Sequence, residues 1–461
     1  MARTGSPDRP DDPRRARRGR RVPAPAAGRA LELGPHRRGG RLPPLVPPPT
    51  EDRKGWCLVR PRQTAHDGTR RLRVGVLVTG LAITGGLERC VLEDTRELVA
   101  AGHEVEVWHR NAQSPRAAEG PPPYEAMGVR LVEATDYRFG ITTTLRDAWR
   151  FAREGLRIRR SHLDVLWLNR PEYLPFGRVA SLVSGVPLAV HLHHAPNYRR
   201  LGPIAGGRTR YFAVSHAMAR AWAASGVPTD RITIVPNGVD PDAFPAATPA
   251  SVHDARAALG IAEDTPTVLY YGRLTRSKGV LALLEAWGRV RTTAAARVPV
   301  TTPPVAGHTA PAPLLVLAGA LYPEEADAVH AAIDALPAGS VLVLPERDDV
   351  VPLLHAADVV VAPSIEPEGF GRVVVEAMSA GRPVVAAASG GTGEILSGDW
   401  ARYTVDPADP DALAEKLLDT LDDAELDPSL AARCRAWVRD RYGREPHVRA
   451  LLQALLAHAR R

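Results

Sequence analysis

The chain has 461 residues, more than one hydrophobic core normally organises, so we expect at least two domains. Hydrophobic residues make up 44% and charged residues 24%, as in ordinary globular proteins. The net charge of +7 arises in residues 1–70, where 17 Lys and Arg stand against 7 Asp and Glu; residues 71–461 carry 42 and 45. Because the basic charge belongs to one end of the chain, a nucleic-acid partner is not expected.

Residues 1–70 combine Arg, Pro and Gly without a periodic apolar pattern, so we expect a disordered basic tail. The apolar run 72–79, the glycine loop 80–86 and the helical pattern that starts at Leu87 then predict a strand, a loop and a helix. Further strands are predicted at 104–109, 129–132, 165–169, 188–193, 211–214 and 232–235. These elements indicate an N-terminal Rossmann-like domain over residues 71–250.

The pattern restarts in residues 251–425 and predicts a second Rossmann-like domain. Its strands are predicted at 267–272, 314–318, 341–344, 359–362 and 384–387, and its helices near Lys278 and at 324–336, 350–356, 371–380 and 411–421. Strands that alternate with helices are typical of doubly wound parallel sheets. We interpret residues 294–313 as a flexible insertion and residues 426–461 as a helical C-terminal region.

The segment Ser364–Met378 follows a buried strand and leads into a helix, where ligands of parallel α/β sheets bind. Its glycines allow a close backbone approach, and the helix start favours a phosphate. Glu368 and Glu376 would repel a phosphate, so they fit sugar and ribose hydroxyls on either side of a diphosphate. Without further context, two such glutamates would more commonly be interpreted as surface carboxylates, one in a solvated turn and one on a helix surface, than as ligand-binding residues.

A second polar loop, Gly272–Gly279, follows the first strand of the second domain and carries Arg273 and Lys278. The planar fork of an arginine and the point charge of a lysine suit two adjacent phosphates. A solvated basic loop is the alternative.

Four motifs carry a resemblance to the retaining family 4 glycosyltransferases of GT-B fold, the glycogen-synthase-like group 1 enzymes. They are Glu368-x7-Glu376, Gly272-Arg273-Leu274-x3-Lys278-Gly279, Val235-Pro236-Asn237-Gly238-Val239-Asp240 and Gly390-Gly391-x2-Glu394, and the resemblance covers residues 72–425 in order. It implies two facing Rossmann-like domains with the active site in the interdomain cleft, residues 71–250 on the acceptor side and residues 251–425 binding the nucleotide sugar. It also implies transfer of a sugar from a nucleoside diphosphate sugar, such as a UDP-sugar, with retention of anomeric configuration.

The resemblance assigns roles to individual residues. The expected catalytic residues are Glu368 and His193. The residues expected at the donor diphosphate are Arg273, Lys278, Gly85 and Gly86 of Thr84-Gly85-Gly86, Gly371 and Arg372. Those expected at the sugar and ribose are Glu368, Gly369, Phe370 and Glu376. No cofactor is expected beyond the donor substrate itself, and retention would follow from attack on the same face of the sugar.

The histidines after the strand 188–193 leave one assignment open. Strand alternation places His191 and His193 on one face, with His194 at the strand end. The resemblance favours His193 by register, but His194 is a second candidate for the sugar-facing residue. No carboxylate shares the spacing of the histidines, and the family's donor site is metal-free, so no metal is expected. The pairs in Asp240-Pro241-Asp242 and Asp409-Pro410-Asp411 are interpreted as turn or helix caps.

Other function classes fit the residues less well. A nicotinamide-dependent oxidoreductase would need Gly-x-Gly-x-x-Gly after the first strand, and the glycines there do not have that spacing. A nucleotide-sugar epimerase of the same fold remains an alternative, whereas the intact donor motifs argue against a catalytically silent binding module. The acceptor could be a lipid, a polysaccharide or a small molecule.

Cysteine usage and hydropathy predict a cytoplasmic protein. Cys57, Cys90 and Cys434 lie far apart, and no apolar run reaches the length of a membrane span. The Arg-rich segment Leu145–Arg160 also contains Trp149 and suggests peripheral contact with an anionic inner membrane face. A solvated helix face is the favoured alternative.

Overall fold

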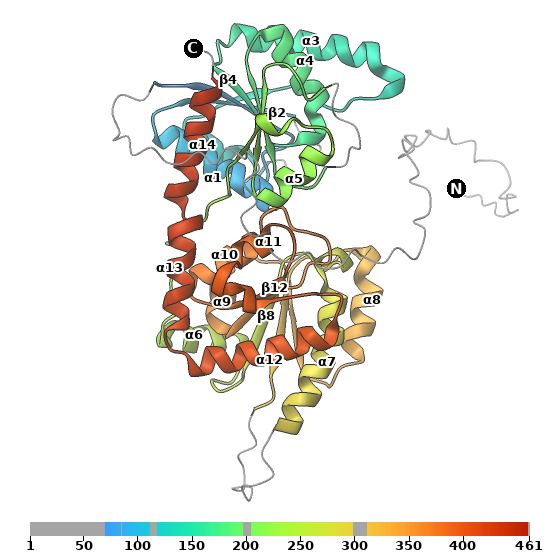
Figure 1. Ribbon diagram of the computed structural model, residues 1–461, viewed down its shortest axis with the longest axis vertical. Helices are drawn as coiled ribbons and strands as arrows, with labels where there is room; N and C mark the ends of the chain where they lie inside the picture. The colour runs from blue at the N-terminus through green and yellow to red at the C-terminus, as the bar shows by residue number, and fades with distance from the viewer. Residues whose placement is uncertain (1–69, 84, 111–117, 197–203, 298–310, 460–461) are drawn as a thin grey trace, which may run out of the picture. The chain divides into compact units, whose positions relative to one another are not determined.

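The computed structural model of the chain describes residues 70–83, 85–110, 118–196, 204–297 and 311–459. It contains two parallel β-sheets, and helices cover both faces of each sheet (Figure 1). Three sequence predictions fall wholly or partly outside the described residues: the tail over 1–69, Thr84 of the glycine loop, and residues 298–310 of the insertion.

The first sheet has seven parallel strands in the order β3-β2-β1-β4-β5-β6-β7. The strands are β1 (Arg73–Val78), β2 (Glu104–His109), β3 (Arg130–Glu133), β4 (Val165–Leu168), β5 (Leu188–Leu192), β6 (Thr209–Ala213) and β7 (Ile232–Ile234). The helices between them are α1 (Gly86–Ala100), α2 (Pro121–Glu125), α3 (Thr144–Arg160), α4 (Leu174–Ser184) and α5 (His216–Ala224).

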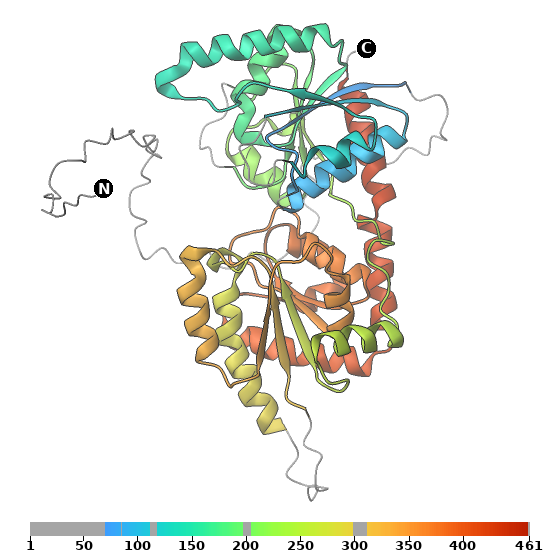
Figure 2. The same ribbon diagram turned by 180° about the vertical axis from the view of Figure 1, so that it is seen from behind.

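Two hydrophobic cores cover this sheet. Side chains of β1 that alternate along the strand pack against α1 on one face, while α3, α4 and α5 fill the other face. The C-terminal helix α14 (Arg444–His458) returns to the α1 face, where Leu451 and Leu455 are buried. Figures 1 and 2 show α14 beside α1 from opposite sides.

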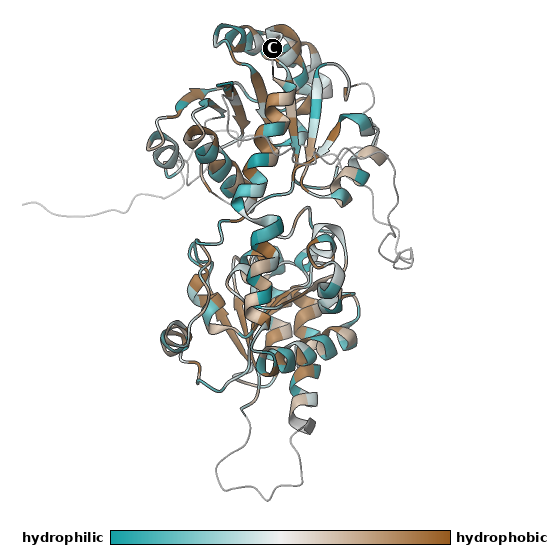
Figure 3. Ribbon diagram, turned by 60° about the vertical axis from the view of Figure 1, so that its left-hand side comes forward, coloured by the Kyte–Doolittle hydropathy of each residue, from teal (hydrophilic) through white to brown (hydrophobic). Residues whose placement is uncertain are grey.

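The second sheet has six parallel strands in the order β10-β9-β8-β11-β12-β13. The strands are β8 (Thr267–Tyr271), β9 (Leu314–Ala318), β10 (Val341–Leu344), β11 (Val359–Ala362), β12 (Val384–Ala387) and β13 (Thr404–Val405). The helices are α6 (Pro249–Leu259), α7 (Val280–Arg297), α8 (Pro323–Asp334), α9 (Val351–Ala356), α10 (Arg372–Ser379), α11 (Gly390–Ile395), α12 (Pro410–Leu426) and α13 (Leu430–Tyr442). Hydropathy colouring shows apolar strands between helices whose outer faces are polar (Figure 3).

The predicted strands are confirmed, with ends that differ by one or two residues, and two details are corrected. The two-residue strand β13 was not predicted, because so short a segment has no period to detect. Helix α7 continues to Arg297, four residues into the stretch expected to be an insertion, because alanines there extend the helix. The predicted cap at Asp409 is confirmed, since its carboxylate accepts hydrogen bonds from the first turn of α12. Ser215 caps α5 in the same way and accepts a hydrogen bond from the Met218 amide.

Both sheets have one point at which the strand order reverses. It lies between β1 and β4 in the first sheet and between β8 and β11 in the second. Loops that leave the carboxyl ends of two such strands diverge and leave room for a ligand. Each predicted donor loop therefore follows a strand at a crossover point: Arg273 and Lys278 follow β8, and Glu368 follows β11.

Candidate active site

The loop after β8 packs directly against the loop after β11. Lys278 ends a 3-10 turn over Arg276–Lys278, and Gly279 follows with φ +80°. A Cβ at Gly279 would stand 1.9 Å from the Pro363 carbonyl oxygen, so only glycine permits this approach. The Lys-Gly pair of the motif thus places the lysine beside the loop after β11 that carries Glu368, which we call the acidic loop.

Lys278 and Glu368 form an ion pair in this arrangement. The Lys278 Nζ lies 2.5 Å from Glu368 Oε1, and the buried Ser364 hydroxyl donates to the same oxygen at 2.6 Å. About a quarter of each charged side chain is exposed. Arg273 is exposed, and its guanidinium forms no hydrogen bond or ion pair with any residue that the structure describes. The loops therefore bring together the cations expected at a diphosphate and the carboxylate expected at a sugar.

Glu376 occupies a more enclosed position on α10. Its carboxylate accepts from the Tyr271 hydroxyl at 3.0 Å and from Arg372 Nε at 2.9 Å. Arg372 also donates to Glu93 of α1 at 3.0 Å and to the Cys90 sulfur at 3.1 Å. Burial lowers the pKa of Arg372, but the neighbouring thiol and carboxylates outweigh burial and the pKa is raised. Arg372 thus holds Glu376 and α1 together and stays charged.

Two residues assigned to the donor have side chains engaged elsewhere. The Phe370 ring is 5% exposed and packs edge-on against Tyr442 of α13, with centroids 5.7 Å apart, so its side chain belongs to the hydrophobic core. Only its main chain is left to face a ligand. The Arg372 guanidinium is mostly buried and already paired with Glu93 and Glu376, so its role at the diphosphate stays a prediction.

The glycines assigned to the diphosphate lie at the starts of two helices, α10 and α1. Gly371 precedes α10 with φ +108°, and as a glycine it has no side chain with which to cap this helix start. Gly85 and Gly86 are exposed at the start of α1. A Cβ on Gly86 would come within 3.3 Å of Arg372 Cδ, so the glycine loop of the first sheet lies beside the start of α10.

His193 stands at the end of β5, next to the acidic loop. A Cβ on Gly369 would be 2.0 Å from the His193 carbonyl oxygen. The His193 ring packs on His191, with centroids 4.1 Å apart, as strand alternation predicts, and its Nε2 is 3.5 Å from Asn169 Oδ1. Burial, followed by the nearby His194, lowers the pKa of His193 to about 3, so the ring is neutral at pH 7.

His194 belongs to a polar network that sequence reasoning missed. Its Nε2 is 3.1 Å from Glu172 Oε2, and its Nδ1 is 2.8 Å from the Ala195 carbonyl oxygen. Arg170 pairs with Glu172 at 3.3 Å and with Glu88 of α1. The hydrogen bond to Glu172 raises the pKa of His194. Because both of its ring nitrogens have acceptor partners, His194 is held in place. His193 is the histidine that lies beside the acidic loop.

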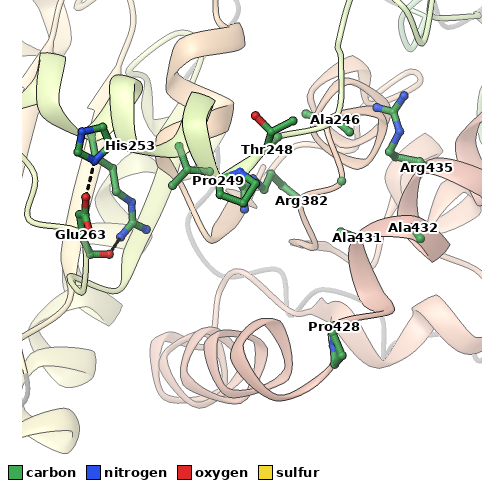
Figure 4. A pocket seen from close by; sticks show the side chains of 15 residues that line it. Ala246, Thr248, Pro249, His253, Glu263, Arg382, Pro428, Ala431, Ala432 and Arg435 are labelled. Atoms are coloured by element: carbon green, nitrogen blue, oxygen red, sulfur yellow. Dashed lines mark hydrogen bonds and ion pairs between the residues drawn. The ribbon is translucent and has the colours of Figure 1, made fainter.

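A surface pocket of about 650 Å³ lies away from all of these residues (Figure 4). Two arginines in its wall donate to main-chain carbonyls: Arg382 to Leu354 and His355, and Arg435 to Phe244 and Ser379. Arg382 thus ties the segment after α10 to the end of α9, and Arg435 ties α13 to the segment before α6 and to the end of α10. We therefore interpret the arginines of this pocket as structural.

Comparison with known proteins decides the family. The sequence pattern described as glycosyl transferases group 1 matches residues 251–437, and the pattern described as glycosyltransferase family 4 matches residues 84–243. A D-inositol 3-phosphate glycosyltransferase of Geodermatophilus obscurus is 30% identical over 361 residues, which cover 72% of this chain and 76% of the relative. This chain belongs to the group 1/family 4 glycosyltransferases.

Other relatives of this glycosyltransferase are named for different acceptors. A D-inositol 3-phosphate glycosyltransferase of Xylanimonas cellulosilytica is 29% identical over 84% of this chain and 96% of its own. A glycogen synthase of Mycobacterium tuberculosis is 28% identical over 78% of this chain and 87% of its own. Among solved structures, Anabaena Alr3699/HepE in complex with UDP and glucose has a TM-score of 0.68 at 23% identity, covering 84% of this chain and all of that one. These likenesses confirm the GT-B fold.

Proposed function

We propose that this glycosyltransferase moves a sugar from a nucleoside diphosphate sugar to an acceptor hydroxyl with retention of anomeric configuration. The ion pair between Lys278 and Glu368 at the crossover of the second sheet is the observation that carries the proposal. A donor diphosphate would pair with the Lys278 ammonium in place of Glu368. The Glu368 carboxylate could then accept hydrogen bonds from sugar hydroxyls. The likeness to the Anabaena protein, whose structure is a complex with UDP and glucose, supports a donor of this class.

The charge of the departing diphosphate sets the main catalytic demand. Arg273, Lys278 and the amides at the start of α10 would stabilise that charge without reorganisation. The bond between the sugar C1 and the phosphate oxygen breaks, the bond between C1 and the acceptor oxygen forms on the same face, and the acceptor proton moves to the phosphate. Neutral His193 would orient the sugar, and Glu376 would bind the ribose. Neither a cofactor nor a covalent glycosyl-enzyme is required.

A donor screen tests this function. Purified protein is incubated with UDP-, GDP- and dTDP-sugars, and mass spectrometry follows the release of nucleoside diphosphate and transfer to candidate acceptors. Release and transfer are expected with at least one donor. NMR of the product should show the anomeric configuration of the donor sugar; the opposite configuration would refute retention. An isomerised nucleotide sugar without release would instead indicate an epimerase.

Variants of the ion pair test the site. Lys278→Ala and Glu368→Ala should each lower kcat by about 10²-fold or more, because preorganised charge at the reacting groups is lost. Arg276→Ala is the matched control, since Arg276 is an exposed cation of the same 3-10 turn with no proposed donor contact. Full activity of either ion-pair variant, with folding confirmed by circular dichroism, would contradict the assignment.

The relatives are named for acceptors of several classes: inositol phosphate, glycogen and lipopolysaccharide. We propose that acceptor contacts come from the first sheet, where Arg170 and Glu172 lie beside His193. Inositol 3-phosphate, glucans and glycolipids are therefore the acceptors to test first.

We also propose that α3 contacts an anionic membrane surface. Leu145, Trp149 and Leu156 are 87%, 66% and 47% exposed, and their spacing places them on one stripe of the helix. Phe151 and Ile158 on the opposite face are buried. Exposed arginines flank the stripe: Arg146, Arg153, Arg159 and Arg160. Apolar side chains between cations fit the interface of an anionic bilayer.

The chain would then act in the cytoplasm at the inner membrane face. None of the described helices has the length and hydropathy to cross a membrane, so such contact would be peripheral. Cys90 and Cys434 are free thiols, which a reducing compartment maintains.

Vesicle co-sedimentation tests the membrane proposal. The protein should bind phosphatidylcholine vesicles that contain phosphatidylglycerol, less so at high salt, and Leu145→Ser with Trp149→Ser should weaken binding about tenfold. Leu426→Ser on α12 is the control, since Leu426 is likewise an exposed apolar side chain, at 78%, but lies outside the stripe. Unchanged binding of the double variant, or concentration-dependent dimers that the double variant abolishes, would contradict a membrane role for the stripe.

A further inference from the structure

The start of α5 is held by a carboxylate from a distant segment of the chain. Glu394 on α11 accepts hydrogen bonds from the His216 amide at 2.8 Å and from the Ala217 amide at 2.5 Å. These are the first two amides of a nine-residue helix, where free N–H groups and the helix dipole favour negative charge. Glu394 thus joins α11 of the second sheet to α5 of the first.

Ser215 adds a second bond from the same helix start. Its hydroxyl accepts from the Met218 amide at 3.2 Å and donates to the Gly369 carbonyl oxygen at 2.7 Å. Gly369 directly follows Glu368, the carboxylate proposed to bind the sugar. The start of α5 therefore also touches the acidic loop itself.

The start of α11 also contacts the loop that carries Glu368, in addition to the contact from the start of α5. The Gly391 amide donates to the Glu368 carbonyl oxygen at 2.8 Å. A Cβ on Gly390 would lie 2.4 Å from that carbonyl oxygen, and one on Gly391 would lie 2.4 Å from the Phe370 carbonyl oxygen. The two glycines are thus needed for α11 to lie directly under the acidic loop. The Glu368 carbonyl group is therefore held by α11 of the second sheet, and the Gly369 carbonyl group is held by the start of α5 in the first sheet.

We infer that Glu394 is a positioning residue for sugar transfer, which fixes the Glu368 loop against the end of β5 so that Glu368 and His193 face one donor sugar. The inference rests on the proposed function. It assigns a task to the Gly390-Gly391-x2-Glu394 motif: the glycines allow contact with the loop, and the glutamate fastens that contact to α5. The Kd of the nucleoside diphosphate should depend on Glu394 little, because the side chains proposed to bind the nucleotide, those of Arg273, Lys278 and Glu376, all belong to the second sheet.

The test compares Glu394→Ala with Asp409→Ala. Asp409 is the matched control because its carboxylate also accepts from two amides at a helix start, those of Asp411 and Ala412, but far from the donor loop in sequence. Both variants should lower the melting temperature. Only Glu394→Ala should lower kcat, by at least tenfold, with an unchanged Kd for the nucleoside diphosphate. Glu394→Gln, which keeps one acceptor oxygen, should recover part of kcat.

Two results would overturn the inference. One is a kcat of Glu394→Ala equal to that of the wild type; the other is a loss shared equally by Asp409→Ala, which would mark a merely structural role. If Glu394→Ala does not fold, Ser215→Ala should lower kcat while Ser215→Thr, which keeps the hydroxyl, retains it; equal kcat values in these two would also overturn it. Absence of donor turnover in the wild-type protein would instead defeat the proposed function.

Discussion

Gly369→Ala is the substitution whose effect follows most directly from the geometry. The Cβ that alanine adds would stand 2.0 Å from the His193 carbonyl oxygen, and ordinary contact begins at 3.4 Å. The acidic loop must therefore move away from β5 by more than about 1 Å, a displacement that can cost about 10²-fold in rate when it affects reacting groups. Gly369 does not have a positive φ, so the effect would come from the contact and not from backbone strain.

The assay is steady-state transfer with the donor found in the screen. Gly369→Ala should lower kcat about 100-fold, while the Kd of the nucleoside diphosphate changes less than about threefold, because the nucleotide contacts lie elsewhere in the second sheet. Gly206→Ala is the control, since a Cβ there would meet nothing within 4 Å. A Gly369→Ala enzyme with wild-type kcat would refute the close approach between the loop and β5.

Three further substitutions test other contacts. Tyr271→Phe removes the 3.0 Å hydrogen bond to Glu376 and should weaken nucleoside diphosphate binding about threefold to tenfold by calorimetry; unchanged affinity would separate Glu376 from the ribose. Phe370→Ala should lower the free energy of unfolding by about 3–5 kcal/mol in urea titration, because the ring is buried; a loss below about 1 kcal/mol would place the ring outside the core. His447 faces Asp94 Oδ1 and the Pro236 carbonyl oxygen, both at 2.6 Å; burial alone would lower its pKa, but Asp94 outweighs burial and the pKa is raised. The imidazolium therefore stabilises the fold fully below the ordinary pKa of 6.5 and less as the pH rises through the folded value, so His447→Gln should lower the melting temperature more at pH 6 than at pH 9. A deficit that grows with pH would contradict the ion pair.

Most of the fold could be predicted because it depends on local patterns. Apolar β-branched runs and turn residues located the strands, and alternation with helices predicted parallel sheets. The polar loops could be placed for the same reason: residues that follow neighbouring parallel strands meet at one edge of a sheet. The proximity of Lys278 and Glu368, 90 residues apart, is a consequence of that rule.

The direction of individual side chains could not be predicted in the same way. Phe370 lies in a glycine-rich loop, and only the packing of α13 decides that its ring turns inward toward Tyr442. Arg372 meets Glu93, 279 residues earlier in the chain, and Glu394 meets α5 about 180 residues earlier; no local period records such contacts. The paired glycines before Glu394 were the one local signal of close packing there.

The histidine pair shows where sequence and structure complement each other. Strand alternation predicted that His191 and His193 share a face, which is confirmed. It could not rank His193 against His194, because that choice depends on Glu172 from another strand's loop. With His194 tied to Glu172, we retain His193 as the histidine proposed to face the sugar.

Affinity for a diphosphate is the property on which the proposed mechanism depends. The direct measurement is the Kd of a nucleoside diphosphate and of its monophosphate, by calorimetry, for the wild type and Lys278→Ala. Wild-type protein should bind the diphosphate at least about tenfold more tightly, and Lys278→Ala should remove most of that preference. Equal affinity for both nucleotides, or a preference that survives the loss of Lys278, would contradict a donor site built around the pair of Lys278 and Glu368.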